Sequence, residues 1–269
     1  MGTANPEDGK MSFWSHLDEL RKRIVYISIA IGVGFIACFN YSEDILGLLL
    51  LPLNATAGFH AAFPFITFTP NKSVQELHFT ALTEPFMAHL KIGFVAGMML
   101  VLPVILYQIW KFISPGLLRQ ERKYASQFVV FATIFFGIGV LFCFFFLLPF
   151  AIPFLVGYKT EHLKPIIKIG EYINFTLMFM LGAGAVFELP LIMIVLGRIG
   201  VINVESLTRF RKYAFLGSFV IGGILTPTPD AFNMTIMSIP IYLLYELGIL
   251  GVRIFGKKKD LDSTELTEI

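Results

Sequence analysis

Two acidic residues stand out because the segments around them are strongly basic. Glu19 lies in the sequence SHLDELRKR, directly before the first apolar run, and Glu121 follows the second apolar run in the sequence RQERK. Carboxylates pair with cationic groups, so these two side chains together could bind a cationic ligand. The alternatives are that Glu19 pairs with Arg23, four residues later on the same helix, and that Glu121 is a solvated surface charge. The spacing alone leaves both interpretations open.

A third carboxyl group, that of Glu188, lies inside an apolar run in the sequence VFELP. A charged residue within a membrane helix costs roughly 2.5–3.5 kcal/mol on insertion scales, so a functional role is the first hypothesis for it. The alternative is a protonated carboxyl group that hydrogen-bonds to a neighbouring helix. Pro190 has no amide hydrogen and favours a kink beside Glu188. For Glu246, which lies closer to Arg253, we expect a structural role.

The other reactive side chains form no catalytic or metal-binding pattern. The five His are scattered, without an HExxH, a GxSxG or a phosphate-binding loop, and the two Cys lie in apolar runs without CxxC spacing. No nucleophile is paired with a base. The sequence therefore predicts no enzyme activity, no cofactor, no metal site and no disulfide.

The composition predicts that these carboxyl groups belong to a membrane protein. Of 269 residues, 56% are hydrophobic, 15% are charged and 29 are Phe, and the mean hydropathy is +0.74. A soluble domain carries about a quarter charged residues, so the composition excludes this class. The net charge of +2 is too small to indicate a nucleic acid partner.

The apolar runs predict an all-α integral membrane protein with six transmembrane helices. The spans cover about residues 24–40, 86–112, 128–149, 172–197, 213–225 and 234–252. They lie in a membrane domain of residues 15–252, between a disordered tail of residues 1–14 and a basic, then polar tail of residues 253–269. The last two spans are short. The fifth has 13 residues, which give roughly 20 Å of helix against a hydrocarbon core of about 30 Å.

The basic residues predict the orientation. Of the 21 Lys and Arg, 16 lie before the first span, at the end of the second span and in the loop that follows it, in the loop after the fourth span, or after the sixth span. Cytoplasmic loops carry the excess of such residues, so we expect both termini in the cytoplasm. On the outer side, the nine apolar residues Ile45–Leu53 are too few to span the membrane. They predict a short interfacial helix closed by Pro52, within a cap formed by the outer loops.

Several short motifs follow one another along the chain. They are HLxELRxR at residues 16–23, Pro-Leu at 52–53, PVILYQ at 103–108, FxxPGLxxxER at 112–122, FELP at 187–190 and LTP at 225–227. Together with the six spans, this combination resembles the TatC family, the multispanning core of the twin-arginine protein translocase. The resemblance runs from about Ser15 to Val252. Two departures precede the sixth span, where residues 226–230 read TPTPD instead of the common Thr-Pro-Pro-Asp and Met234 replaces a polar residue.

The resemblance implies a receptor that binds twin-arginine signal peptides on the cytoplasmic face and helps to export folded proteins with the proton-motive force. It places Glu19 and Glu121 in the signal-peptide site, with Leu20, Arg21 and Phe112 beside them. It also implies that Pro52, Glu188 and Asp230 are needed for transport or for assembly with partners. A guanidinium group binds carboxylates through paired hydrogen bonds, which suits two carboxylates on that face.

The implied partners are single-span TatA- and TatB-type subunits, the lipid bilayer of a bacterial-type inner membrane and further copies of this chain. The alternative function is that of a proton-coupled small-solute transporter in which Glu188 relays the proton. We find no internal repeat of the kind that many such transporters contain, which argues against this alternative.

Overall fold

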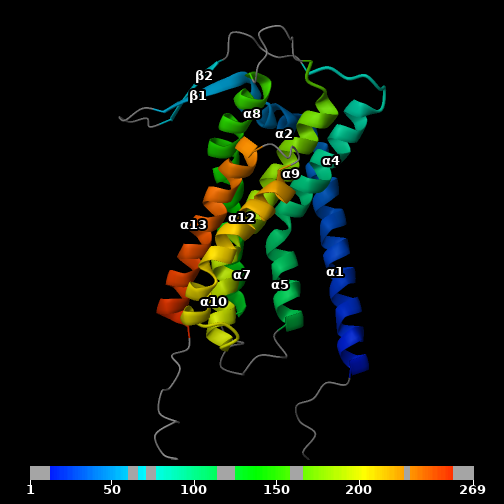
Figure 1. Ribbon diagram of the computed structural model, residues 1–269. Helices are drawn as coiled ribbons and strands as arrows, with labels where there is room; N and C mark the ends of the chain where they lie inside the picture. Colours follow the sequence, from blue (N-terminus) through cyan, green and yellow to red (C-terminus); the bar gives the residue numbers. More distant parts are fainter. Residues whose placement is uncertain are drawn as a thin grey trace, which may run out of the picture. The chain divides into compact units, whose positions relative to one another are not determined.

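The computed structural model describes residues 13–59, 66–70, 77–113, 125–157, 166–226 and 231–256, and helices make up most of this part of the chain (Figure 1). The predicted all-helical class is confirmed, with one small β hairpin as an addition. By its internal contacts the chain divides into two units, Met1–Ser42 with Ile92–Thr133 and Glu43–Lys91 with Ile134–Ile269.

Four described helical segments are long and apolar enough to cross a membrane, namely His16–Asn40, Gln127–Gly157, Ile169–Ile199 and Ala231–Phe255. The pair Glu84–Leu100 and Leu102–Phe112, bent by 55°, is long and apolar enough only when taken together, and it makes a fifth if the pair is one broken span. The predicted fifth span corresponds to α12 (Arg211–Leu225), whose 15 residues give roughly 22 Å of helix and leave it short. The predicted sixth span is longer than expected, because α13 (Ala231–Phe255) has 25 residues.

In the first unit, α1 (Phe13–Asn40) packs along α5 (Leu102–Ile113) (Figure 1). It also crosses α4 (Glu84–Leu100) where two glycines face each other. A Cβ atom added to Gly34 would lie 2.6 Å from the carbonyl oxygen of Gly97, and one added to Gly97 would lie 2.6 Å from the backbone of Gly34. The absence of side chains therefore lets the two backbones touch, as small residues do in membrane helices.

The bend between α4 and α5 has a proline beside it. Pro103 is the second residue of α5; it lacks an amide hydrogen, and its ring crowds the preceding turn. The helical ladder starts again when Val104 and Ile105 both donate to the carbonyl oxygen of Val101, at 2.9 and 3.1 Å. The new direction carries Gln108 and Phe112 along the first half of α1.

The second unit contains two long apolar rods. One consists of α7 (Ala125–Phe142) from Ile134 on, the π-helical turn η2 (Cys143–Leu147) and α8 (Leu148–Gly157). The other consists of α9 (Ile169–Phe187) and α10 (Leu189–Ile199). Glycines bring the rods together, because a Cβ atom on Gly139 would lie 2.8 Å from the carbonyl oxygen of Ala183. One on Gly184 would lie 2.6 Å from the ring of Phe136. The close contact lies next to Glu188.

Helices α10 and α12 both pack on α13, the last helix of the chain's described part. After the short helix α11 (Val204–Arg209), α12 runs along α13, and α10 packs on α13 as well (Figure 1). A Cβ atom on Gly222 of α12 would lie 2.7 Å from the hydroxyl oxygen of Ser238, and one on Gly197 of α10 would lie 2.7 Å from Val252. Small residues again permit close packing of helices.

The segment after α1 forms a short helical cap within the second unit. It consists of α2 (Ser42–Leu49) and α3 (Leu51–Asn54), so the predicted short helix begins earlier than expected. Pro52 is the second residue of α3 and does not close a helix, because a proline is tolerated in a first turn, where its missing amide hydrogen has no partner to bond. The Tyr172 hydroxyl of α9 donates to the Leu49 carbonyl oxygen at 2.6 Å and ties the cap to the second rod.

A hairpin follows the cap helices. β1 (Ala55–Phe59) pairs antiparallel with β2 (Ile66–Pro70), with Ala57 opposite Phe68. From the sequence alone, these residues are expected only as part of an outer loop. The β-branched residues of both strands favour extended backbone, and the antiparallel ladder satisfies backbone groups that a loop would leave to water.

Candidate functional site

A cluster of three polar side chains joins α1 to α5 in the first unit. Arg23 Nη2 donates to Glu19 Oε1 at 2.8 Å, and Arg23 Nη1 donates to Gln108 Oε1 at 3.2 Å. The side chains of Arg23 and Glu19 are 15% and 17% exposed. The spacing of four residues puts Glu19 and Arg23 on one face of α1, and the bend after α4 brings Gln108 to that face. The pairing of Glu19 with Arg23, one of the two alternatives from the sequence, is therefore present.

The hydrogen-bonding capacity of this cluster is only partly used. Glu19 Oε2 and Arg23 Nε are both buried and have no hydrogen-bond partner among the described residues. A carboxylate can accept at both oxygens, and a guanidinium group has five N–H donors. Glu19 is thus held by one arm of Arg23 and keeps one acceptor unused.

A ring contact lies on the same faces of these two helices. The rings of His16 and Phe112 stack with centroids 4.4 Å apart and an interplanar angle of 16°. Phe112 was predicted as a site residue, whereas His16 and Gln108 were not, although both lie in the quoted motifs. Their spacing could have identified them. His16 is seven residues before Arg23 and Gln108 is four before Phe112, so each lies on the same helix face as its partner in the sequence.

Three further residues were predicted for this site, namely Leu20, Arg21 and Glu121, and two of them are described by the structure. Leu20 is half-buried and Arg21 is exposed. Glu121 lies outside the described residues, so the expected convergence of its carboxylate with that of Glu19 stays a prediction.

Glu188 lies where the second rod is interrupted, between α9 and α10. Its backbone amide bonds to the Ala185 carbonyl oxygen at 3.2 Å, and Pro190 is the second residue of α10. The side chain is half-buried, and Oε1 is buried without a hydrogen-bond partner among the described residues. A polar atom in this position can accept a hydrogen bond from a group that another chain brings.

The two remaining predicted residues are Pro52 and Asp230. Pro52 is fully buried in α3, and α3 packs against α8. Asp230 lies outside the described residues. Within the described ranges no three His, Cys, Asp or Glu side chains gather as metal ligands would.

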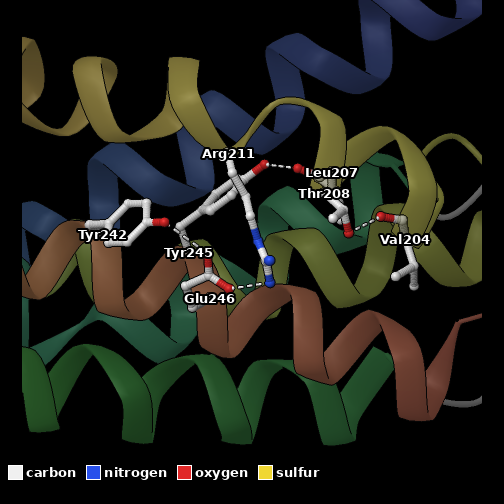
Figure 2. A network of polar contacts seen from close by, with 7 residues as sticks. All are labelled: Val204, Leu207, Thr208, Arg211, Tyr242, Tyr245 and Glu246. Atoms are coloured by element: carbon white, nitrogen blue, oxygen red, sulfur yellow. Dashed lines mark hydrogen bonds and ion pairs between the residues drawn. The ribbon is translucent and has the colours of Figure 1, made fainter.

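A second polar network holds the C-terminal helices together (Figure 2). Arg211 Nη2 lies 2.7 Å from Glu246 Oε2, and the Tyr242 hydroxyl donates to Glu246 Oε1 at 3.0 Å. The Tyr245 hydroxyl donates to the carbonyl oxygen of Leu207 at 2.8 Å. Glu246 has the expected structural contact, and its partner is Arg211, which is 35 residues away in the sequence.

Comparison with known proteins identifies the family. A family model described as Sec-independent protein translocase protein (TatC) matches residues 15–240. The TatC protein of Desulforapulum autotrophicum is 37% identical over 262 residues, which are 97% of this chain and 92% of that protein. The chain belongs to the TatC family. The TatC protein of Carboxydothermus hydrogenoformans is 36% identical over 94% of this chain and 97% of its own length.

A solved structure agrees with the sequence comparison. The crystal structure of a twin-arginine translocase receptor TatC aligns with a TM-score of 0.73 and 33% identity, over 89% of this chain and 98% of that chain. The fold described above is therefore the TatC fold of six membrane spans. The chain is a component of a Sec-independent protein translocase.

Proposed function

We propose that this chain is the receptor of the translocase and binds the twin-arginine signal peptide of folded cargo at the cluster around Glu19. The observation that carries the proposal is that the largely buried Glu19 carboxylate already binds a guanidinium group and keeps one oxygen unused. Arginine donates in a fixed fork, whereas a lysine ammonium acts as a point charge. Such a carboxylate therefore favours an arginine of the peptide over a lysine. The resemblance adds Glu121, Leu20, Arg21 and Phe112 to the site.

The test is binding of a labelled twin-arginine peptide to the full chain in lipid nanodiscs, with a twin-lysine peptide as the comparison. Hydrogen bonds to charged groups contribute about 1.5–3 kcal/mol, so Glu19→Ala and Glu121→Ala should each weaken binding by about tenfold or more. Asp18→Ala is the matched control, because Asp18 is the exposed acidic neighbour of Glu19. Equal binding of both peptides, or unchanged affinity in both glutamate variants, would refute the proposal.

The orientation and location of the chain belong to the same proposal. The excess of basic residues before the first span, around two loops and after the sixth span supports cytoplasmic termini, in a bacterial-type inner membrane whose proton-motive force drives export. This orientation puts the cluster around Glu19 on the cytoplasmic side, where signal peptides arrive.

Partner subunits form the second part of the proposal. One face of α13 carries a row of apolar side chains with exposures of 50–64%, made up of Ile239, Leu243, Leu247, Leu250 and Ile254. Their spacing of three and four residues matches the seam along which another helix packs. We infer that the single-span TatA- and TatB-type subunits pack on membrane helices of this chain, and that Glu188 offers them a polar contact. Further copies of this chain complete the receptor complex.

The small-solute transporter alternative receives no support. The relatives named above are protein translocase subunits, and no observation on Glu188 favours a solute over a polar group of a partner helix.

A further inference from the structure

The Glu19 carboxylate is already occupied in this structure by a residue of the same chain. Arg23 Nη2 bonds to Oε1 at 2.8 Å, and Oε2 is buried beneath neighbouring atoms. A ligand from solution therefore meets one oxygen that is bonded to Arg23 and another that is buried. Whatever cation the site binds must first change this arrangement.

We propose that Arg23 is an internal competitor that sets the affinity of the signal-peptide site. The arginine of the peptide displaces the Arg23 guanidinium from Glu19, and Arg23 moves into the cytoplasmic water. The inference rests on the proposed function, because it concerns the same carboxylate.

The contact that has to be broken is incomplete on both sides. Arg23 uses one arm toward Glu19, and both its Nε and Glu19 Oε2 lack a partner among the described residues. A partly satisfied polar network is weaker than a complete one, because each buried group without a partner carries its desolvation penalty. A guanidinium group that approaches end-on or side-on can bond to both carboxylate oxygens at once. The peptide arginine thus replaces one hydrogen bond by two.

Gln108 stabilises the occupied state. Its Oε1 accepts from Arg23 Nη1 at 3.2 Å, across 85 residues of sequence, and so fixes the guanidinium between α1 and α5. Without this acceptor, Arg23 would leave Glu19 more often. Gln108 thereby acts on the ligand through Arg23, as a positioning residue.

The size of the effect follows from how often Arg23 is away from Glu19. We call this the open state, and the state with Arg23 bonded to Glu19 the closed state. The apparent dissociation constant rises in proportion as the binding-competent fraction falls. An ion pair of this kind on a helix, together with one hydrogen bond, corresponds to a closed state favoured by about three- to tenfold. Removal of Arg23 should therefore strengthen peptide binding by about this factor.

The experiment measures the affinity of a labelled twin-arginine peptide for the full chain in nanodiscs. Arg23→Ala should bind about three- to tenfold more tightly than the unchanged protein. The control is Lys22→Ala, which removes the same charge from the adjacent, exposed position and should change the affinity much less. Gln108→Met should strengthen binding in the same direction by a smaller factor, and it changes no charge.

The outcomes separate this inference from the proposed function. If the unchanged protein prefers the twin-arginine peptide and Glu19→Ala weakens binding, the function holds. Weaker or unchanged binding by Arg23→Ala would then overturn the inference alone, as would an equal gain in Lys22→Ala. If Arg23→Ala does not fold, Gln108→Met decides, and the absence of a gain in that variant overturns the inference.

Discussion

Glu188 is the residue whose position conflicts most with its chemistry. It interrupts the apolar segment Ile169–Ile199, 11 residues before the end, which is roughly 16 Å along the helix. Its Oε1 is buried without a hydrogen-bond partner among the described residues. In the preceding turn, Gly184 lies so close to the ring of Phe136 that there is no space for a side chain at this position. Polar groups within the hydrocarbon need partners from protein, so the carboxyl group is suited to a polar residue of an incoming helix.

We therefore expect Glu188→Ala to impair the contact with partner subunits and the export of cargo, with peptide binding near normal. Glu188→Gln should be milder, because an amide still forms hydrogen bonds and needs no proton. Export of a folded twin-arginine cargo and peptide affinity would be measured on the same variants. Full export by Glu188→Ala would reduce this residue to a structural polar group.

The crossing of α1 and α4 shows how one element controls the position of the site. Gly34 and Gly97 let the two backbones touch, while α5, which continues from α4 after the bend, carries Gln108 to Arg23 of α1. The bend and the crossing together fix the first half of α1 on α5. A change at the crossing should consequently alter the geometry of the proposed signal-peptide site, although neither glycine belongs to it.

Gly34→Ala should lower stability by about 1–3 kcal/mol, because its Cβ atom would overlap the backbone of α4, which cannot move aside as a flexible side chain would. The matched control is Gly32→Ala on the same helix, where a Cβ atom meets nothing within 4 Å. Alanine there should be neutral or stabilising, since glycine is a poor helix former. Thermal unfolding of the detergent-solubilised variants measures both. Equal midpoints would mean that α1 and α4 do not touch at Gly34.

At the scale of the whole molecule, the distribution of charge predicts the orientation in the membrane. The basic residues lie mainly before the first span, around the loops after the second and fourth spans, and after the sixth span, and this asymmetry orients membrane proteins. The proposed site depends on this orientation, because a signal peptide in the cytoplasm can bind at Glu19 only if the start of α1 lies on that side.

We expect single cysteines at residues 159–170 to react with a membrane-impermeant thiol reagent from outside, and those at 116–124 only from inside. The native Cys38 and Cys143 would first be replaced, since both are free thiols. The reverse labelling pattern would overturn the predicted orientation and, with it, the proposed location of the signal-peptide site.

The sequence by itself determined the class of the fold, because a membrane interior requires long apolar helices and each helix satisfies its own backbone locally. It also offered the pairing of Glu19 with Arg23 as one of two alternatives, since residues four apart on a helix share a face, and the structure then showed this pairing. Hydropathy correctly predicted that α12 is short. It predicted a sixth span shorter than α13 at both ends, because apolar content determines which residues lie in lipid and not where a helix ends.

Only the tertiary structure decided which distant residues meet. Gln108 joins Arg23 across 85 residues and Arg211 joins Glu246 across 35. No local pattern predicts such contacts, because they depend on how glycines and prolines set the approach and direction of whole helices. The covered state of the Glu19 carboxylate follows from one of them. A helical pattern shows which side chains share a face, and the packing of helices shows which of those side chains are already occupied.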